Sequence, residues 1–335
     1  MDTTVNNPPS FADDQKELAK QIKAWANALP RSLKASVGDN EVRIGKVQVN
    51  FDSRAQQSTQ SLQYCKKKYA VDGGELYFVY PWELAQLPRI LSHFNSRLEL
   101  DSRKFAAKRL LLEIIPQKEA DAFAKEFHIQ GSARGTGKVS YGLRAPKTKE
   151  LLAVQQYCLT RWSLKKTDAQ SNVWEGLRLV IKADVQIHGA ATRLQKAFLD
   201  ENKPSELMSY VDYSHSLGTY KTAQGFENTF TSRESYMWCL TGTPKDVAIV
   251  DKNGVTRHPD LALVAQTPYL NPNRMAGAFG KGVGQTFYGG KLGSRAELKA
   301  QGNTELFHND LIMEAIGYTR IFTAGQLRWH KHFDN

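Results

Sequence analysis

The chain has 335 residues, of which 41% are hydrophobic, and 45 Lys and Arg against 34 Asp and Glu give it a formal net charge of +11. This length and composition predict a folded protein of about two domains and exclude a disordered one. No apolar run approaches the roughly 18 residues of a membrane span, and the polar N-terminus shows no signal-peptide pattern. We therefore expect a cytoplasmic protein without a membrane partner. Three widely spaced cysteines exclude a disulfide framework and a cysteine metal cluster.

The positive charge is concentrated in one segment. Residues 101–200 contain 18 Lys and Arg against 10 Asp and Glu, whereas residues 201–250 are slightly acidic. Such a local bias indicates a polyanionic partner, most simply double-stranded DNA, although a solvated basic surface would give the same count. The predicted DNA contacts are basic residues of two loops: Arg134, Lys138, Arg161, Lys165 and Lys166.

The first hundred residues predict a helix followed by a small α/β unit. Apolar residues recur at helical spacing over residues 13–29, with acidic residues at the start and a proline at the end. Alternating apolar residues over 41–51 predict one or two strands. A short apolar strand at 77–80 then leads into a helix that begins at Pro81 and runs to about residue 95.

Residues 41–130 resemble the very-short-patch-repair type nuclease module, with a PD-(D/E)xK-like fold, of phage homing endonucleases. The matching pieces are residues 41–43, 49–58, 66–68 and 77–83. The resemblance implies double-stranded DNA as the partner, DNA cleavage as the activity and an infected host cell as the setting.

The nuclease positions depart from that pattern. Metal-dependent cleavage needs carboxylates to hold a hard cation and a basic group beside it. Arg43, Asn50 and Gln57 stand where the pattern has Asp, Glu and His. Asp52 and Glu41 remain and could hold a cation in a shifted arrangement. The expectation is a degenerate nuclease domain that has lost its chemistry and still binds DNA.

From residue 104 the pattern changes to a second unit. It predicts strands at 106–115, 139–143, 151–159, 173–183, 207–211 and 236–240, with helices at 117–127, after residue 189 and near residue 220. The basic loop 131–138 does not form a phosphate-binding P-loop, because Ser132 replaces a required Gly and Val139 replaces the required Ser or Thr. A loop that touches phosphates and a plain hairpin connection both stay open.

A turn with small residues precedes the helix after residue 189. Its backbone N–H groups, at a helix N-terminus, can hold a pyrophosphate, although small residues also begin helices for packing reasons. Together with Tyr220 shortly before Gly225 and Phe226, this turn resembles the acyl-CoA site of the GNAT acyltransferase superfamily. The resemblance implies acyl-CoA binding by four residues: Gln186, Gly189, Ala190 and Ala191.

The second unit also resembles the Mom-type DNA adenine-modifying proteins, a GNAT-related phage family. That resemblance implies His128, Asp212 and Tyr220 as catalytic residues, with His128 and Asp212 near a divalent metal ion. The interval from Asp212 to Tyr220 is shorter than in that pattern, and His215 is a rival ligand. A helix C-cap, a turn residue and a core tyrosine are the structural alternatives. His330 and His332 could bind a metal on one exposed strand face.

The predicted fold class is α/β (α+β) in three parts. Residues 1–100 form the degenerate nuclease-like domain, residues 101–245 the GNAT-like mixed-sheet domain, and residues 246–335 a C-terminal extension with a helix at 311–316 and a closing hairpin at 317–329. Three functions follow from the resemblances: transfer of an acyl-type group to a DNA base, DNA cleavage by an active homing endonuclease, and non-enzymatic DNA binding.

Overall fold

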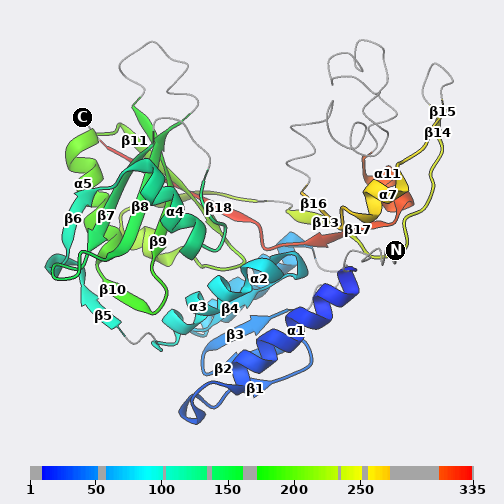
Figure 1. The fold of residues 1–335 in the computed structure, drawn as a ribbon, viewed down its shortest axis with the longest axis horizontal. Helices are drawn as coiled ribbons and strands as arrows, with labels where there is room; N and C mark the ends of the chain where they lie inside the picture. Colours follow the sequence, from blue (N-terminus) through cyan, green and yellow to red (C-terminus); the bar gives the residue numbers. More distant parts are fainter. Residues whose placement is uncertain are drawn as a thin grey trace, which may run out of the picture. The chain divides into compact units, whose positions relative to one another are not determined.

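The computed structural model describes residues 10–51, 58–100, 103–133, 138–160, 172–232, 235–250, 256–271 and 309–333. The chain divides into two units (Figure 1): Met1–Leu84 with Arg233–Gly325, and Ala85–Ser232 with Gln326–Asn335. This division differs from the three consecutive domains expected, because each unit is built from two separate stretches of chain. None of the described helices is both long and apolar enough to cross a membrane.

The first unit begins with helix α1 (Phe11–Asn27), close to the predicted span. The Oγ of Ser10 accepts a hydrogen bond from the Asp13 backbone N–H at 3.2 Å, and the Asp13 carboxylate bonds back to Ser10, so a capping box fixes the helix start. A four-stranded sheet follows in the order β1 (Ser36–Val37), β2 (Glu41–Ile44), β3 (Val47–Asn50), β4 (Glu75–Phe78). Helix α2 (Thr59–Val71) connects β3 to the parallel β4.

A second sheet of the first unit has the order β16 (Tyr269–Leu270), β13 (Tyr236–Leu240), β17 (Tyr318–Phe322). The unit also contains the pair β14 (Ile249–Val250) and β15 (Thr256–Arg257) and the helices α7 (Leu261–Ala265) and α11 (Asn309–Ile316), of which α11 contacts β17. The strand predicted at 236–240 is therefore real but does not belong to the sheet of the second unit. Its antiparallel partners are β17 and β16.

The closing hairpin predicted at 317–329 is wrong. Both strands exist, but β17 pairs with β13, whereas β18 (Gln326–His332) pairs with strands of the second unit. The residues between them do not form an exposed turn. Ala324 is fully buried, and its carbonyl oxygen accepts a hydrogen bond from Gln63 Nε2 at 2.9 Å. The chain therefore passes from the sheet of β17 to the sheet of β18 without forming a hairpin.

The second unit is built on a seven-stranded mixed sheet. Its strand order is β12 (Glu227–Thr231), β18, β11 (Glu206–Asp212), β9 (Val173–Ile181), β8 (Leu151–Leu159), β7 (Val139–Arg144), β6 (Leu111–Ile114). The remaining elements are α3 (Leu87–Arg97), β5 (Arg103–Ala106), η3 (Ala107–Arg109), α4 (Gln117–Phe127), β10 (Val185–His188), α5 (Ala190–Asn202) and α6 (Thr219–Ala223). All pairs in the seven-stranded sheet are antiparallel except β9 with β11.

Helices α4 and α5 lie on opposite faces of this sheet (Figure 1). Helix α4 buries Phe123 and Ala120 against Val154 and Val180. On the other face, the ring of Phe198 in α5 stacks on Tyr157 with centroids 3.8 Å apart. From β6 to α6 the element order agrees with the order expected from the sequence, apart from the short β10. The last strands of the sheet are β12 and the C-terminal β18 instead of residues 236–240.

The strand predicted at 106–115 is interrupted. Residues 103–106 form β5, which pairs in parallel with β10, and residues 111–114 form β6 at the edge of the large sheet. The turn between them is held from α5, because the Arg193 guanidinium donates to the carbonyl oxygens of Ala107 and Leu110. The segment predicted as one strand therefore forms two short strands, which belong to two different sheets.

Candidate active site

The large sheet opens between its two parallel strands. Strands β9 and β11 pair over four residues, from Val173 opposite Glu206 to Gly176 opposite Ser209. Beyond that point β9 continues to Ile181 beside β8, and β11 continues to Asp212 beside β18. Over these described residues the two strands no longer pair with each other. The carboxyl ends of parallel strands in open sheets are common ligand sites.

The predicted cofactor turn joins β10 to α5. Gly189 is exposed and has φ +79 and ψ 10, a conformation that favours glycine, and no side chain caps the helix there. An added Cβ would meet Ala107 Cβ at 3.8 Å, which is ordinary contact, so the conformation rather than crowding selects glycine. The first N–H groups of a helix have no intrahelical acceptor. No side chain accepts from these donors at the start of α5.

The other three residues of the predicted turn differ in their surroundings. Gln186 lies in β10 opposite Lys104 of β5, and its Oε1 is buried without a hydrogen-bond partner among the described residues. Ala190 is buried, and Ala191 is half-buried. Ala190 thus anchors the first turn of α5 in the core, while Gln186 offers an unused acceptor just before the turn.

His128 and Asp212 lie close together through Gln130. The Gln130 backbone N–H donates to His128 Nδ1 at 3.1 Å, and Gln130 Nε2 donates to Asp212 Oδ2 at 3.2 Å. His128 ends α4 as its C-cap, and Asp212 ends β11. Gln130 therefore bridges two residues distant in the sequence, through its backbone N–H to His128 and through its side chain to Asp212. Their catalytic roles stay a prediction.

His128 is a neutral imidazole at physiological pH. Burial lowers its pKa to about 3, and the positive charges of Arg178 and Arg89 add to this effect. Since Nδ1 accepts the Gln130 N–H, the neutral ring carries its proton on Nε2. His128 is therefore a weak base and a hydrogen-bond donor, rather than the proton acceptor expected from an ordinary histidine.

Asp212 is held ionised by its neighbours. Burial opposes its charge, but His215 Nδ1 at 3.7 Å from Oδ2 and the Ser214 N–H at 2.9 Å from Oδ1 outweigh it and lower the pKa of Asp212. His215 is buried directly behind this carboxylate. The rival ligand noted in the sequence thus supports Asp212 instead of replacing it.

Glu175 and Arg178 are functional candidates that the sequence analysis did not assign. Both lie half-buried on β9, Glu175 one residue before the last pair with β11 and Arg178 just beyond that pair. Burial raises the pKa of Glu175 and lowers the pKa of Arg178, while each charge partly offsets the shift of the other. Arg178 Nε also donates to the Gly131 carbonyl oxygen at 3.1 Å. A Glu-x-x-Arg spacing on a predicted strand was the available signal.

Tyr220 is the third predicted catalytic residue. It is on α6 with 38% of its surface exposed, and the Lys221 Nζ lies 5.2 Å from its ring centroid. Desolvation raises the pKa of Tyr220 to about 12, so the phenol keeps its proton at neutral pH. Within the described structure it makes no hydrogen bond to His128 or Asp212.

Part of the positive charge of residues 101–200 is paired with acidic side chains of the same segment. Lys138 Nζ lies 3.1 Å from Asp121 Oδ1 and its side chain is only 7% exposed, so this predicted DNA contact is engaged within the domain. Arg103 and Lys182 both pair with Glu150. The other predicted contacts, Arg134, Arg161, Lys165 and Lys166, lie outside the described residues.

The nuclease-like positions belong to the first unit. Arg43 on β2 lies 3.8 Å from Glu41 and donates to Gln48 Oε1 at 3.1 Å, and Gln48 in turn donates to Glu41 at 2.6 Å. Asn50 ends β3, whereas Asp52 and Gln57 lie outside the described residues. The Glu41 carboxylate is thus occupied by an arginine and an amide, and the nuclease-like fold itself stays a prediction.

A metal ion at His128 and Asp212 stays a prediction. His128 Nδ1 and both Asp212 oxygens already accept hydrogen bonds. Within the described part of the chain, these two residues belong to no group of three His, Cys, Asp or Glu side chains close enough to share a metal. The chemistry of this site is therefore derived from its side chains alone.

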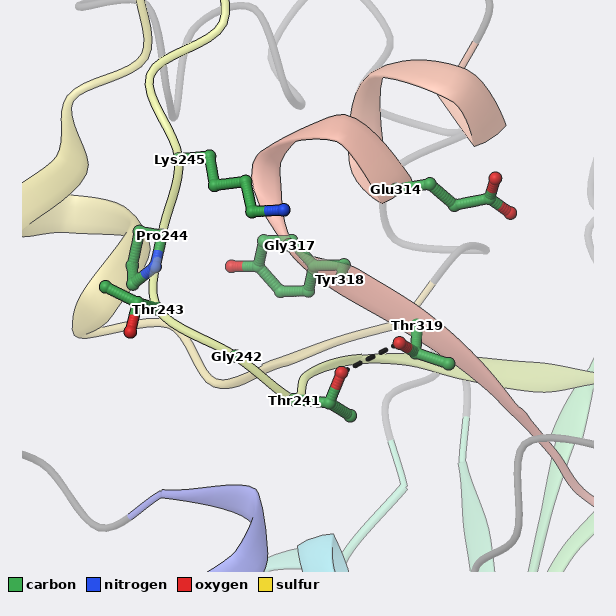
Figure 2. A pocket seen from close by; sticks show the side chains of 9 residues that line it. All are labelled: Thr241, Gly242, Thr243, Pro244, Lys245, Glu314, Gly317, Tyr318 and Thr319. Atoms are coloured by element: carbon green, nitrogen blue, oxygen red, sulfur yellow. Dashed lines mark hydrogen bonds between the residues drawn. The ribbon is translucent and has the colours of Figure 1, made fainter.

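The first unit contains a separate cavity of about 480 Å³ (Figure 2). It is lined by residues 241–245, 317–319 and Glu314, and a hydrogen bond of 2.8 Å joins the hydroxyls of Thr241 and Thr319 across it. None of the predicted site residues lines this cavity. We therefore place the candidate active site at the opening of the large sheet and not in this cavity.

No protein-family model matches the chain, and no curated protein matches it. Part of the chain is similar to solved acetyltransferases. Nourseothricin acetyltransferase has 9% identity over 37% of this chain and 86% of its own, with a TM-score of 0.28. The IAA acetyltransferase from Bacillus cereus ATCC 14579 has 14% identity over 44% and 92%, with a TM-score of 0.26. Mutant forms of the spermidine/spermine N-acetyltransferase SpeG from Vibrio cholerae have 11% identity over 36% and 82%, with a TM-score of 0.26.

Proposed function

We propose that the second unit is an acyl-CoA-dependent acyltransferase that moves an acyl group to an amine nitrogen. The observation that carries this proposal is the separation of β9 from β11 after Gly176 and Ser209, with the exposed Gly189 turn leading into α5. An opening between parallel strands suits an extended ligand, and a bare helix N-terminus suits its phosphates.

The turn residues fit this cofactor. The N–H groups of Gly189, Ala190 and Ala191 would hold its phosphates, because no side chain caps this end of α5. The buried Gln186 Oε1 has no partner among the described residues and would accept a hydrogen bond from the ligand. When bound, acyl-CoA supplies a thioester whose carbonyl carbon is open to attack by an amine.

Glu175 is our assignment for the general base. Its raised pKa brings proton affinity closer to neutral pH, and it lies on β9 beside the opening. It takes the proton of the attacking amine as the new C–N bond forms and the C–S bond breaks. The charged Asp212 is a poorer base, because its pKa is lowered.

His128 and Tyr220 are assigned the two remaining catalytic roles. The neutral His128 donates its Nε2 hydrogen to the carbonyl oxygen that gains negative charge during attack, as a neutral imidazole can. Tyr220 keeps its proton at neutral pH and gives it to the leaving thiolate. Asp212 and Gln130 are positioning residues that hold the His128 ring.

Isothermal titration with acetyl-CoA, followed by a thiol-release assay with a panel of amines, tests this function. We expect saturable binding and amine-dependent thiol release. Amine-dependent thiol release that is unchanged in Glu175→Gln would reject only the assignment of Glu175 as the base. No heat with acetyl-CoA, at concentrations that saturate a micromolar site, would overturn the proposal itself.

A DNA base is the second candidate acceptor, favoured by the net charge of +11 and by an exposed aromatic residue. Tyr210 is 42% exposed and stands two residues before Asp212 on the same face of β11, where a base extruded from the duplex could stack. Arg134, Arg161, Lys165 and Lys166 would then contact phosphates.

Fluorescence anisotropy with labelled DNA at several salt concentrations tests this candidate. We expect affinity to fall steeply with salt, as counterion release requires, and to drop in Tyr210→Ala. The control is Tyr64→Ala, which removes another exposed tyrosine in the first unit. A flat salt response, or equal losses in the two variants, would remove DNA as the acceptor.

A further inference from the structure

Three potential metal ligands converge where the last strand meets β11. Glu206 begins β11, and His330 and His332 lie near the end of β18. One ligand atom from each side chain lies within 4.8 Å of the others. We propose that these residues form a transition-metal site of the zinc class that fastens the C-terminal strand to the sheet.

The strand register places all three side chains on one face. Glu206 is directly opposite His332, and Met208 is directly opposite His330, in the antiparallel pair β11–β18. Side chains two residues apart on a strand share a face, so His330 and His332 project together. Their ring centroids are 6.1 Å apart. Lys331 between them points to the other face, where its Nζ donates to the Gln224 carbonyl oxygen at 2.7 Å.

The donor chemistry suits a borderline cation. Two imidazole nitrogens and one carboxylate oxygen are a set that Zn²⁺ uses, with a fourth position left open to water. At bond lengths of about 2.1 Å, tetrahedral ligand atoms lie about 3.4 Å apart. Only small side-chain rotations are needed to bring the three ligand atoms from their present spacing, within 4.8 Å of one another, to the tetrahedral spacing. His332 is exposed, so its side chain is free to rotate.

His330 supports the proposal independently of spacing. Its Nδ1 contacts Glu206 Oε1, while its Nε2 is buried without a hydrogen-bond partner among the described residues. A buried ring nitrogen without a partner is an uncommon and costly arrangement in a protein without a ligand. The side chains of His330 and Glu206 are 15% and 22% exposed, so the site is sheltered but open to solvent on the His332 side.

The site has a structural consequence for the whole second unit. Strand β18 lies between β11 and β12 and carries Gln326 opposite Asp212 at its other end. A metal that bridges Glu206 to His330 and His332 holds the register of this strand pair. This inference is independent of the proposed acyl transfer, since neither the opening of the sheet nor the Gly189 turn takes part in it.

Titration of the chelator-treated full-length protein with Zn²⁺ tests the proposal. We expect one equivalent bound, a rise in thermal midpoint with Zn²⁺ concentration, and a d–d spectrum of tetrahedral intensity when Co²⁺ replaces Zn²⁺. His332→Ala should weaken Zn²⁺ binding at least tenfold and remove the thermal shift. Its exposed position at the strand end leaves the fold intact, which far-ultraviolet circular dichroism checks.

The matched control is His258→Ala. His258 also pairs with a carboxylate, since its Nδ1 lies 2.8 Å from Asp246, but among the described residues it belongs to no group of three ligands. This variant should bind Zn²⁺ as the wild type does. Wild-type protein that binds no stoichiometric Zn²⁺, or a His332→Ala variant that binds as tightly as the wild type, would overturn the proposal.

Discussion

The hydroxyl of Ser209 donates a hydrogen bond to the Gly176 carbonyl oxygen at 3.1 Å, across the last residue pair that β9 and β11 share. Ser209 is buried, so this bond lies inside the sheet at the point where the two strands separate. A side chain thus links the two strands immediately before the opening that we assign to the cofactor.

Ser209→Ala should destabilise the protein by about 1 kcal/mol, because the variant loses one buried hydrogen bond. Urea unfolding measures this change. Ser205→Ala, just before β11, removes a hydroxyl without a hydrogen bond in the described structure and should change the free energy of unfolding by less than about 0.5 kcal/mol. Equal stabilities of the two variants would contradict a role for the Ser209 hydroxyl at the opening.

Gly189→Ala should lower acetyl-CoA affinity at least tenfold. Alanine at φ +79 costs about 1 kcal/mol, and the turn relieves this strain by reorienting the N–H groups that we assign to phosphates. The matched control is Gly45→Ala, at φ +56 with open space around it, in the hairpin between β2 and β3. Both variants should lose similar stability by thermal unfolding, but only Gly189→Ala should lose affinity by titration calorimetry.

Glu175→Gln should lower kcat by about 10²–10⁴-fold, the usual contribution of a general base. Because burial raises the pKa of Glu175, the wild-type rate should fall on the acid side at a pH above the ordinary glutamate value of 4.5. This acid limb should disappear in the variant. A pH–rate profile that keeps the limb after the substitution would assign the base to another residue.

His128 should make the protein less stable in acid. Its pKa is about 3 in the folded protein and about 6.5 when unfolded, so the unfolded chain binds more protons between these values. The stability that His128 contributes is complete above pH 6.5 and is lost as the pH falls towards 3, by up to about 1.4 kcal/mol per pH unit. Urea unfolding at pH 7 and pH 5 should show a smaller loss in His128→Asn than in the wild type.

Plasmid DNA incubated with the protein and Mg²⁺ or Mn²⁺ should stay uncut. Arg43 and Gln48 already contact the Glu41 carboxylate, and two further acidic or basic positions of the nuclease pattern carry Asn50 and Gln57. Agarose electrophoresis measures this outcome. Cutting that disappears in Asp52→Ala would show that the first unit keeps an active nuclease site.

Most individual elements of the second unit could be predicted from periodicity and breakers. The predicted helix 117–127 and strand 151–159 match α4 and β8 at both ends. Pro116 marks the first of these starts, and the largely apolar sequence of β8, in which even Gln155 and Gln156 are buried, reflects burial on both faces. The glycine turn was predictable as well, because a left-handed residue before a helix favours glycine.

The partners of the strands could not be predicted, because pairing depends on contacts distant in the sequence. The sequence around 236–240 has the apolar pattern of an inner strand in either unit, and only its partner β17 decides between them. The same holds for β18, which seven residues of alternating pattern do not distinguish from a hairpin arm. His128 was found by resemblance, but its low pKa depends first on burial and then on the charges of Arg178 and Arg89, and the fold alone supplies both.

Hydrogen exchange of the full-length protein with and without acetyl-CoA tests the central claim most directly, because it locates the ligand on the chain. We predict slower exchange with acetyl-CoA at residues 189–193 and at the separated ends of β9 and β11, residues 177–181 and 210–212. Unchanged exchange at these residues while acetyl-CoA binds, or protection confined to the first unit, would contradict the account.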